Sequence, residues 1–191
     1  MLLTEDARYR STALEQMWAL FDESVWPDWI DQAHIRFGYS ADLRTGMLSQ
    51  DVAIGFDWLY PYLSDTERER IMEGLNRRGI QPFLTSMEQD PWWAHELNNW
   101  FTVIVGGLGI AGMALGDAHP RSQELIDLSL NPMRDYLSIY GRGGEFNESI
   151  AYSNATRIPV TYFFAYYYHI RGGNNALAEH PFPQTGEWTV Y

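Results

Sequence analysis

The stretch Asn98-Asn99-Trp100-Phe101-Thr102-Val103-Ile104-Val105-Gly106-Gly107-Leu108-Gly109-Ile110-Ala111-Gly112-Met113-Ala114-Leu115 lies in the longest uncharged run of the chain. It opens with asparagine, one of the best helix N-caps, and Gly116-Asp117 and then Pro120 follow it. Glycine costs about 1 kcal/mol relative to alanine in a helix interior, so this glycine content indicates that another helix approaches closely. We predict a buried helix from Asn98 to Leu115.

A different structure for the same stretch has to be weighed. Gly107-Leu108-Gly109-Ile110-Ala111-Gly112 matches the G-x-G-x-x-G pattern of dinucleotide-binding proteins, and Asp127 follows at about the expected distance. That pattern binds a nucleotide only inside a strand-turn-helix unit of a parallel sheet. No other part of the chain has the alternating pattern of a strand, so a helix whose small residues permit close packing is the preferred interpretation.

Helical periodicity and capping residues predict the other elements. Apolar residues recur at three- and four-residue steps after Thr12, and Ser64-Asp65-Thr66-Glu67 has the capping-box pattern of a helix start. Pro82 predicts a kink or break in the helix that Ser64 begins. The predicted helices run from about Thr12 to Ser24, from Ser40 or Asp42 to Tyr62, from Ser64 to Met87, from Arg121 to Tyr140, and from Asn147 to Ile170.

Short Gly/Pro turns join these helices, and such turns cannot span the length of a helix, so successive helices must be antiparallel neighbours. The predicted fold class is therefore all-α, with antiparallel helical hairpins that can curve into an incomplete (α/α) toroid over residues 1–173. The remaining residues, 174–191, contain Pro181, Pro183 and Gly186 and are predicted to form a loop or linker.

Composition limits the function classes. The 191 residues are 46% hydrophobic and 20% charged, contain no cysteine, and carry a formal charge of −12 with 13 basic residues, all of them arginines. This acidic balance argues against nucleic-acid binding, and the absence of cysteine excludes disulfides and thiolate metal sites. The uncharged run is short and glycine-rich for a membrane span. No basic segment leads into an apolar run at the N-terminus, so no signal peptide is indicated and localisation stays unassigned.

Two segments carry the residue types that bind sugars and move protons. Trp92-Trp93-Ala94-His95-Glu96-Leu97-Asn98-Asn99-Trp100 sets an imidazole and two carboxamides among three indoles, and Glu148-Ser149-Ile150-Ala151-Tyr152 sets a phenol one helical turn after a carboxylate. Tryptophan rings can stack on sugar rings, and amides, phenols and imidazoles can hold sugar hydroxyls or transfer protons. Both segments lie at predicted starts of long helices, so we expect Asn98 and Tyr152 to open onto one cleft.

Several motifs together resemble one family. They are Asp57-Trp58-Leu59-Tyr60 followed by Leu63-Ser64 and Glu67-Arg68, then Asn98-Asn99-Trp100 leading into Gly106-Gly107-Leu108-Gly109-Ile110-Ala111, and then Glu148-Ser149-Ile150-Ala151-Tyr152. Their order and separations resemble the helical domain of heparinase II/III-like polysaccharide lyases, including alginate lyases of that fold. The resemblance covers about Leu43 to Gly172. It implies an incomplete (α/α) toroid, a further C-terminal β-rich domain that this chain lacks, and a periplasmic or secreted protein.

The resemblance also implies a reaction, the β-elimination of a uronic-acid-containing glycan, with an acidic polysaccharide or oligosaccharide as partner and no cofactor. The family's asparagine, which neutralises the uronate carboxylate, corresponds to Asn98, its tyrosine corresponds to Tyr152, and His95 resembles a histidine or acid that some members carry nearby. The remaining catalytic histidine of the family normally comes from beyond this chain, so the isolated chain is expected to be nearly inactive. The expected substrate-binding residues are Trp92, Trp93, Asn99, Trp100, Glu148, Arg142 and Arg157.

Each of these residues also has a purely structural interpretation. Asn98 can be a helix N-cap, Glu148 an acid at a helix N-terminus, and Tyr152 a core or rim residue of a tyrosine-rich helix. His95 can be a polar residue at a loop edge, and its neighbour Glu96 cannot share a helix face with it, so no metal site is predicted. Two other functions stay open: a helical-toroid glycoside hydrolase using Asp57, Glu96 or Glu148, or a non-catalytic carbohydrate-binding fragment.

Overall fold

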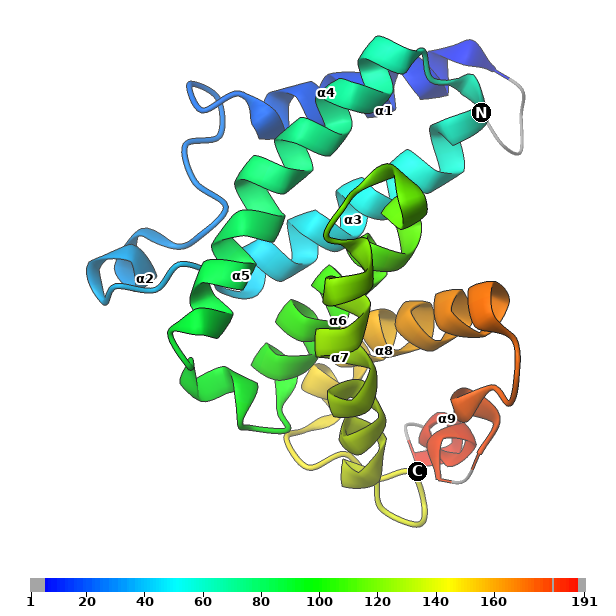
Figure 1. Cartoon of the computed structure of the whole chain (residues 1–191). Helices are drawn as coiled ribbons and strands as arrows, with labels where there is room; N and C mark the ends of the chain where they lie inside the picture. The colour runs from blue at the N-terminus through cyan, green and yellow to red at the C-terminus, as the bar shows by residue number, and fades with distance from the viewer. Residues whose placement is uncertain (1–5, 180, 189–191) are drawn as a thin grey trace.

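The computed structural model describes residues 6–179 and 181–188, and within these residues every regular element is a helix. The predicted all-α class is confirmed. The main helices, seen in Figure 1, are α1 (Ala7–Phe21), α2 (Gln32–Arg36), α3 (Leu43–Leu59), α4 (Asp65–Leu75), α5 (Gln81–Glu88), α6 (Asn99–Leu115), α7 (Ser122–Tyr136), α8 (Ile150–Arg171) and α9 (Thr185–Trp188). The 3₁₀ turns are η1 (Tyr60–Tyr62), η3 (Trp92–Ala94), η4 (Gly116–Ala118), η5 (Leu137–Ile139), η6 (Ala176–Ala178) and η7 (Phe182–Gln184).

The helix α6 is the centre of the fold. It packs against α3, α7 and α8, and nearly all of its residues are buried, from Phe101 to Leu115 with only Val103 and Ala114 partly exposed. The segment Asn99–Ala118 is long and apolar enough to cross a membrane, but 72% of its most apolar window is buried inside the protein. That burial is what a core helix has, and the predicted buried helix is confirmed.

The glycines of α6 allow the neighbouring helices to approach its backbone closely. A side chain on Gly46 of α3 would meet the backbone of Val103 and Ile104, and one on Gly107 would meet the backbone of Gly46. Two helix backbones therefore touch at this crossing, which only glycine permits. On the opposite side of α6, Gly109 packs against Phe163 of α8.

The same contacts fix the helix directions. Along α6, Gly106, Gly109 and Gly112 face Met133, Ser129 and Leu125 of α7 in descending order, so α6 and α7 are antiparallel. Gly106 and Gly109 face Pro159 and Phe163 of α8 in ascending order, so α6 and α8 run parallel. The starts of α6 and α8 consequently lie at the same end of the layer, as the sequence predicted.

The segment that Ser64 begins shows how the chain accommodates Pro82. The predicted capping box is present: the Ser64 hydroxyl accepts from the Glu67 backbone N–H, and Glu67 accepts from the Ser64 N–H. The helix then widens into a π-helical turn, η2 (Asn76–Ile80), before continuing as α5 with Pro82 in its first turn. A proline has no N–H to donate, and a wider turn relieves the clash of its ring with the preceding turn.

Other boundaries differ from the sequence prediction for local reasons. The helix α1 begins at Ala7, because Asp6 accepts from the Arg8 backbone N–H and caps it. The helix α8 begins at Ile150 rather than near Asn147, because Ser149 is its N-cap. The helix α2, capped by Asp31, is too short for periodicity to indicate. Residues 174–179 and 181–188 are not simply a loop: η6, η7 and α9 pack on the domain, with the Phe182 ring 5.3 Å from that of Tyr140.

We expect Gly46→Ala to destabilise the fold, because its methyl group would press on the α6 backbone, which cannot move aside as a side chain could. Overpacking of this kind costs roughly 1–3 kcal/mol, and here it outweighs the helix-propensity gain of about 1 kcal/mol. Urea unfolding followed by circular dichroism measures the change.

Gly55→Ala on the same helix is the matched control, because a side chain there would meet only the flexible end of Met17. Its free energy of unfolding should lie within about 1 kcal/mol of the wild-type value. Equal losses in the two variants would mean that the α3–α6 crossing is not a tight backbone contact.

Candidate functional site

The start of α6 is the first part of the candidate site. Asn98 is its N-cap, as expected: its side-chain oxygen accepts from the backbone N–H groups of Trp100 and Phe101, at 3.0 and 3.3 Å. The cap uses only the Oδ1 atom. Among the described residues the Nδ2 amide donates to no protein group, and this leaves it for a ligand.

Glu148 joins the second motif to the first. Its carboxylate accepts from the backbone N–H of Asn99 at 2.8 Å and from the Asn99 side-chain amide at 2.6 Å. The negative charge therefore lies at the positive N-terminal end of α6, where it is stabilising. Glu148 is thus an acid at a helix N-terminus, as the structural interpretation allowed. The helix is α6, however, and not α8, which Glu148 precedes in sequence. Because Asn99 is committed to Glu148, Asn98 is the member of the pair with a free amide donor.

Buried hydroxyls lie near both helix starts. Thr102 donates to the Asn98 carbonyl at 3.3 Å, and Thr156 donates to the Tyr152 carbonyl at 2.9 Å. Both hydroxyls are neighbours of the fully buried Tyr136 of α7. Burial raises the pKa of the Tyr136 phenol to about 12, and the neighbouring Thr102 and Thr156 hydroxyls offset part of that rise. The backbones of Asn98 and Tyr152 therefore flank one buried tyrosine.

The predicted site residues on α8 and in the loop before it differ in how far they are exposed. Tyr152 lies in the first turn of α8 with its side chain about half exposed. Arg157, one turn further, is partly buried and donates to the Ser153 hydroxyl at 3.4 Å. Arg142 is exposed in the loop before α8. These three side chains are accessible to a ligand, and the two arginines are the nearest cations to Tyr152 in sequence.

The three predicted indoles have different positions. Trp93 is 1% exposed and stacks on Phe83 in the core, so its ring cannot reach a ligand. Trp92 is 43% exposed, and its indole N–H donates to the Tyr39 hydroxyl at 3.1 Å. The rings of Trp92 and Trp100 lie 5.2 Å apart. Of these three indoles, Trp92 and Trp100 are the ones that can offer a face to a sugar.

His95 does not lie on α6. The helix does not extend back to it, and the imidazole is in an exposed loop, where it pairs with the Asp90 carboxylate at 2.6 Å. Its side chain is 62% exposed, and that of Asp90 is 82% exposed. Exposed pairs of this kind contribute little to positioning, since water competes for both partners.

A cluster that the sequence did not predict lies beside Trp100. The His34 ring is 5.0 Å from that of Trp100, edge to face, and stacks on that of Tyr39 at 5.7 Å. Its Nδ1 atom is 2.6 Å from the carboxylate of Asp42, the buried N-cap of α3. Asp42-x-x-Thr45 is recognisable as a capping box, but nothing in the sequence connects it with His34 or with Trp100.

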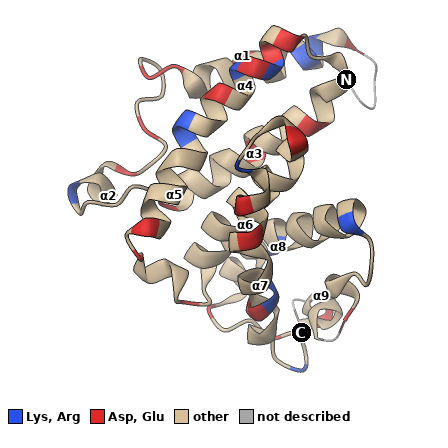
Figure 2. Ribbon diagram, in the orientation of Figure 1, with Lys and Arg blue, Asp and Glu red and all other residues tan. Residues whose placement is uncertain are grey.

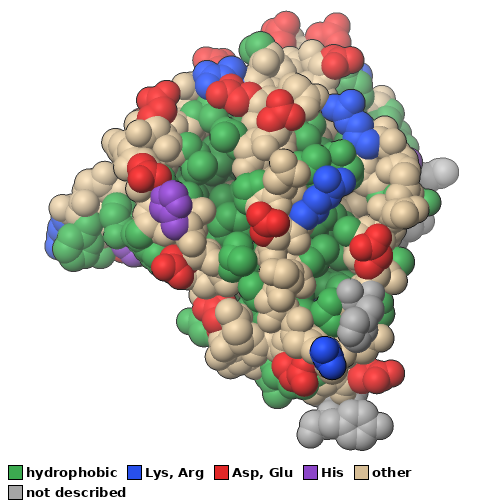
Figure 3. All heavy atoms as spheres, turned by 60° about the horizontal axis from the view of Figure 1, so that its bottom comes forward, with side chains coloured by type: hydrophobic (Ala, Val, Ile, Leu, Met, Phe, Trp, Pro, Cys, Tyr) green, Lys and Arg blue, Asp and Glu red, His purple; other side chains and the backbone are tan. Residues whose placement is uncertain are grey.

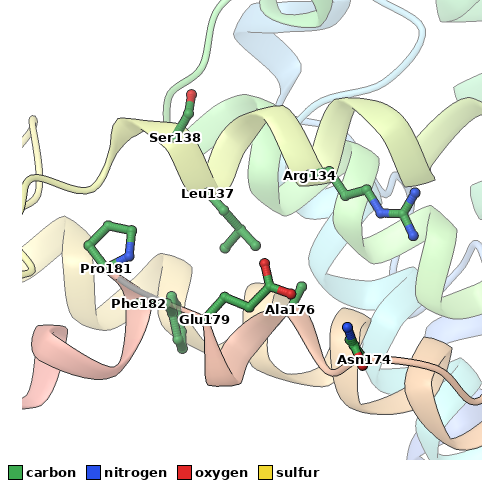
Figure 4. A pocket seen from close by; sticks show the side chains of 8 residues that line it. All are labelled: Arg134, Leu137, Ser138, Asn174, Ala176, Glu179, Pro181 and Phe182. Atoms are coloured by element: carbon green, nitrogen blue, oxygen red, sulfur yellow. The ribbon is translucent and has the colours of Figure 1, made fainter.

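Three cavities lie away from these residues. One, of about 490 Å³, lies between the end of α7 and the C-terminal segment, by which we mean residues 174–179 and 181–188. Glu179 points towards Leu137 in this cavity (Figure 4). Another, of about 520 Å³, lies near His119 and Arg171, and the third, of about 160 Å³, lies near Arg78. Neither Asn98 nor Tyr152 lines any of these three, so the cleft that the two residues are expected to share stays a prediction.

Charged residues of both signs are spread over several elements of the described chain. Acidic and basic side chains occur on α1, α4 and the loops, while α6 carries none (Figure 2). On the face in Figure 3 the two signs are interspersed among hydrophobic side chains. In residues 6–179 and 181–188 no group of three His, Asp or Glu side chains could hold a metal ion.

Comparison with known proteins adds no assignment: no family model matches the chain, and no curated protein matches it. The resemblance to heparinase II/III-like lyases therefore rests on the motifs and their spacing.

We expect Glu148→Gln to loosen the junction between α6 and α8. A glutamine loses the charge at the α6 N-terminus and keeps only one of the two oxygen atoms to which the two Asn99 donors bond. Hydrogen bonds to a charged group contribute about 1.5–3 kcal/mol each, so a loss of roughly 1–2 kcal/mol in the free energy of unfolding is expected. The exposed Glu96→Gln is the control and should be neutral. A Glu148→Gln variant as stable as wild type would show that this tie is dispensable.

Alkaline pH should destabilise the fold through its buried tyrosines. When folding raises the pKa of a phenol, the phenol's contribution to the free energy of unfolding is fully present below its ordinary pKa of 10.0. That contribution is lost as the pH rises towards about 12, the pKa of Tyr136 in the folded protein. Burial also raises the pKa values of Tyr140 and Tyr166. Tyr136→Phe should therefore reduce the fall in urea midpoint above pH 10.0, whereas Tyr9→Phe, at an exposed position, should not.

Proposed function

We propose that this domain belongs to a polysaccharide lyase-like protein that cleaves a uronic-acid-containing glycan by β-elimination, and that its hairpins form part of an (α/α) toroid. The observation that supports this best is the pair of hydrogen bonds between Glu148 and Asn99, because it joins the two segments that carry the family's motifs. Residues 49 positions apart in sequence thereby belong to one corner of the domain.

The chemistry requires a donor for the uronate carboxylate. The C5 proton of a uronate is too weakly acidic to be removed unless the adjacent carboxylate is neutralised, so hydrogen-bond donors must stabilise the enolate-like charge. The Nδ2 amide of Asn98 is such a donor, since the cap uses only Oδ1. Arg157 and Arg142 are the cations nearest in sequence to Tyr152 and would favour an acidic sugar.

The N-terminus of α8 also favours a negatively charged ligand group. The Glu148 carboxylate compensates the N-terminus of α6, whereas the first turn of α8 contains no acid and its N-cap is the neutral Ser149. The positive end of α8 is therefore left to interact with an anionic group beside Tyr152. Tyr152 is exposed there, and its phenol can donate a proton to the leaving glycosidic oxygen.

The geometry disfavours a hydrolase that pairs Asp57 with Glu148. Asp57 accepts from the Tyr166 hydroxyl at 2.9 Å, near the far end of α8, whereas Glu148 precedes its start. At 1.5 Å per residue these positions lie about 25 Å apart along the helix, but the two carboxylates of a glycosidase lie within about 5–9.5 Å of each other.

The test assays the full natural protein for elimination on a panel of uronate polysaccharides. The ultraviolet absorbance of the unsaturated product measures the reaction. Asn98→Asp keeps an excellent helix cap but replaces the amide donor by a second negative charge, so kcat should fall by about 10²–10³ with the fold intact. Tyr152→Phe should lower kcat by about 10²–10⁴ through loss of the proton donor.

Tyr168→Phe is the matched control, because this tyrosine is equally exposed but lies near the other end of α8. Its activity should equal that of wild type. Full activity of Tyr152→Phe would rule out the assigned proton transfer. Binding of the glycan without an unsaturated product, in wild type, would favour the non-catalytic alternative.

A further inference from the structure

The pair His34–Asp42 has the geometry of an oriented base. The Asp42 carboxylate is 1% exposed and accepts from the backbone N–H groups of Asp31 and Arg44, at 2.7 and 2.8 Å, as well as contacting His34 Nδ1 at 2.6 Å. Because an ionised carboxylate can only accept, Nδ1 carries the proton in this contact. In the neutral ring Nε2 then carries the lone pair, and among the described residues the hydrogen bond of the imidazole is to Asp42.

The imidazole is held on further sides and still reaches the surface. Tyr39 stacks on one face, the Trp100 ring meets its edge, and the side chain remains 29% exposed. Trp100 lies two residues after Asn98, whose side chain accepts from the Trp100 N–H. The ring of His34 therefore lies beside the first turn of α6, in the corner that contains Asn98.

The contrast with His95 identifies which histidine is preorganised. Both imidazoles contact an aspartate at 2.6 Å, but the side chain of Asp42 is 1% exposed and that of Asp90 is 82% exposed. Asp42 is fixed by two backbone donors and by its role as the α3 N-cap, so it holds His34 in one orientation and one tautomer. An exposed carboxylate such as Asp90 does neither.

We propose that His34 is the proton-accepting residue of this site and that Asp42 is its positioning residue; this inference rests on the proposed function. The Nε2 atom of His34 takes the C5 proton of the uronate, the C–H electron pair forms the C4–C5 double bond, and the C4–O bond breaks. The phenol of Tyr152 protonates the departing oxygen, and solvent returns the proton from the imidazolium to the phenolate. The buried Asp42 carboxylate stabilises the imidazolium, as in other carboxylate–histidine pairs.

The test compares variants of the full natural protein. His34→Gln offers no basic nitrogen, so kcat should fall by about 10²–10⁴ with little change in KM. Asp42→Asn keeps the α3 cap but can donate to Nδ1, which moves the proton to Nε2 and blocks the base, so kcat should again fall. In His34→Ala, added imidazole should restore part of the rate. Circular dichroism verifies that each variant is folded.

His169→Gln, at an exposed position near the end of α8, is the control and should keep full activity. Wild-type elimination with an unchanged kcat in folded His34→Gln would overturn the role of His34 while leaving the function standing. Loss of turnover in His95→Gln but not in His34→Gln would assign the base to His95 instead. No elimination by wild type on any uronate polymer would overturn the function, and the role of His34 with it.

Discussion

The backbone contact between Gly46 of α3 and Gly107 of α6 is the constraint on which the rest of the domain depends. Side chains would hold two helices about 8–10 Å apart, and glycines remove that spacer. The crossing point lies about 6 Å along α3 from Asp42 and about 12 Å along α6 from Asn99, at 1.5 Å per residue. One apolar contact therefore fixes the distance between the starts of α3 and α6, where the histidine, the indoles and the amides gather.

A polar junction adds the third helix to that corner. Glycines on the opposite side of α6 let α8 lie parallel to it, and Glu148, just before α8, accepts hydrogen bonds from Asn99 at the start of α6. The N-termini of α3 and α8 thus each lie beside that of α6, and each of the three helix ends carries about half a positive charge. The carboxylates of Asp42 and Glu148 compensate two of them, and α8 is capped only by a hydroxyl. Of these three helix ends, that of α8 is therefore the one whose cap carries no charge.

Local patterns predicted what depends on local physics. The boundaries of α6, the Asn98 cap and the Ser64 capping box followed from residues within a few positions, and the parallel run of α6 and α8 followed from the short loops. The sequence could not show that Trp92 is exposed and Trp93 is buried. That difference arises from tertiary packing, in which the Trp93 ring stacks on Phe83. The contact of His34 with Trp100 joins residues 66 positions apart and depends on the α3–α6 crossing, which no local pattern reveals.

The C-terminal segment supports the site indirectly. Gly144 has a positive φ of 85°, and a side chain there would strike the backbone of Gln184 and Thr185, so the loop before α8 lies directly against this segment. Thr185 is buried in that contact. The same loop carries Glu148 to the start of α6, within four residues of Gly144. A segment with the composition of a linker therefore helps to hold the carboxylate that joins the two motifs, and its packing belongs to the structure of the site.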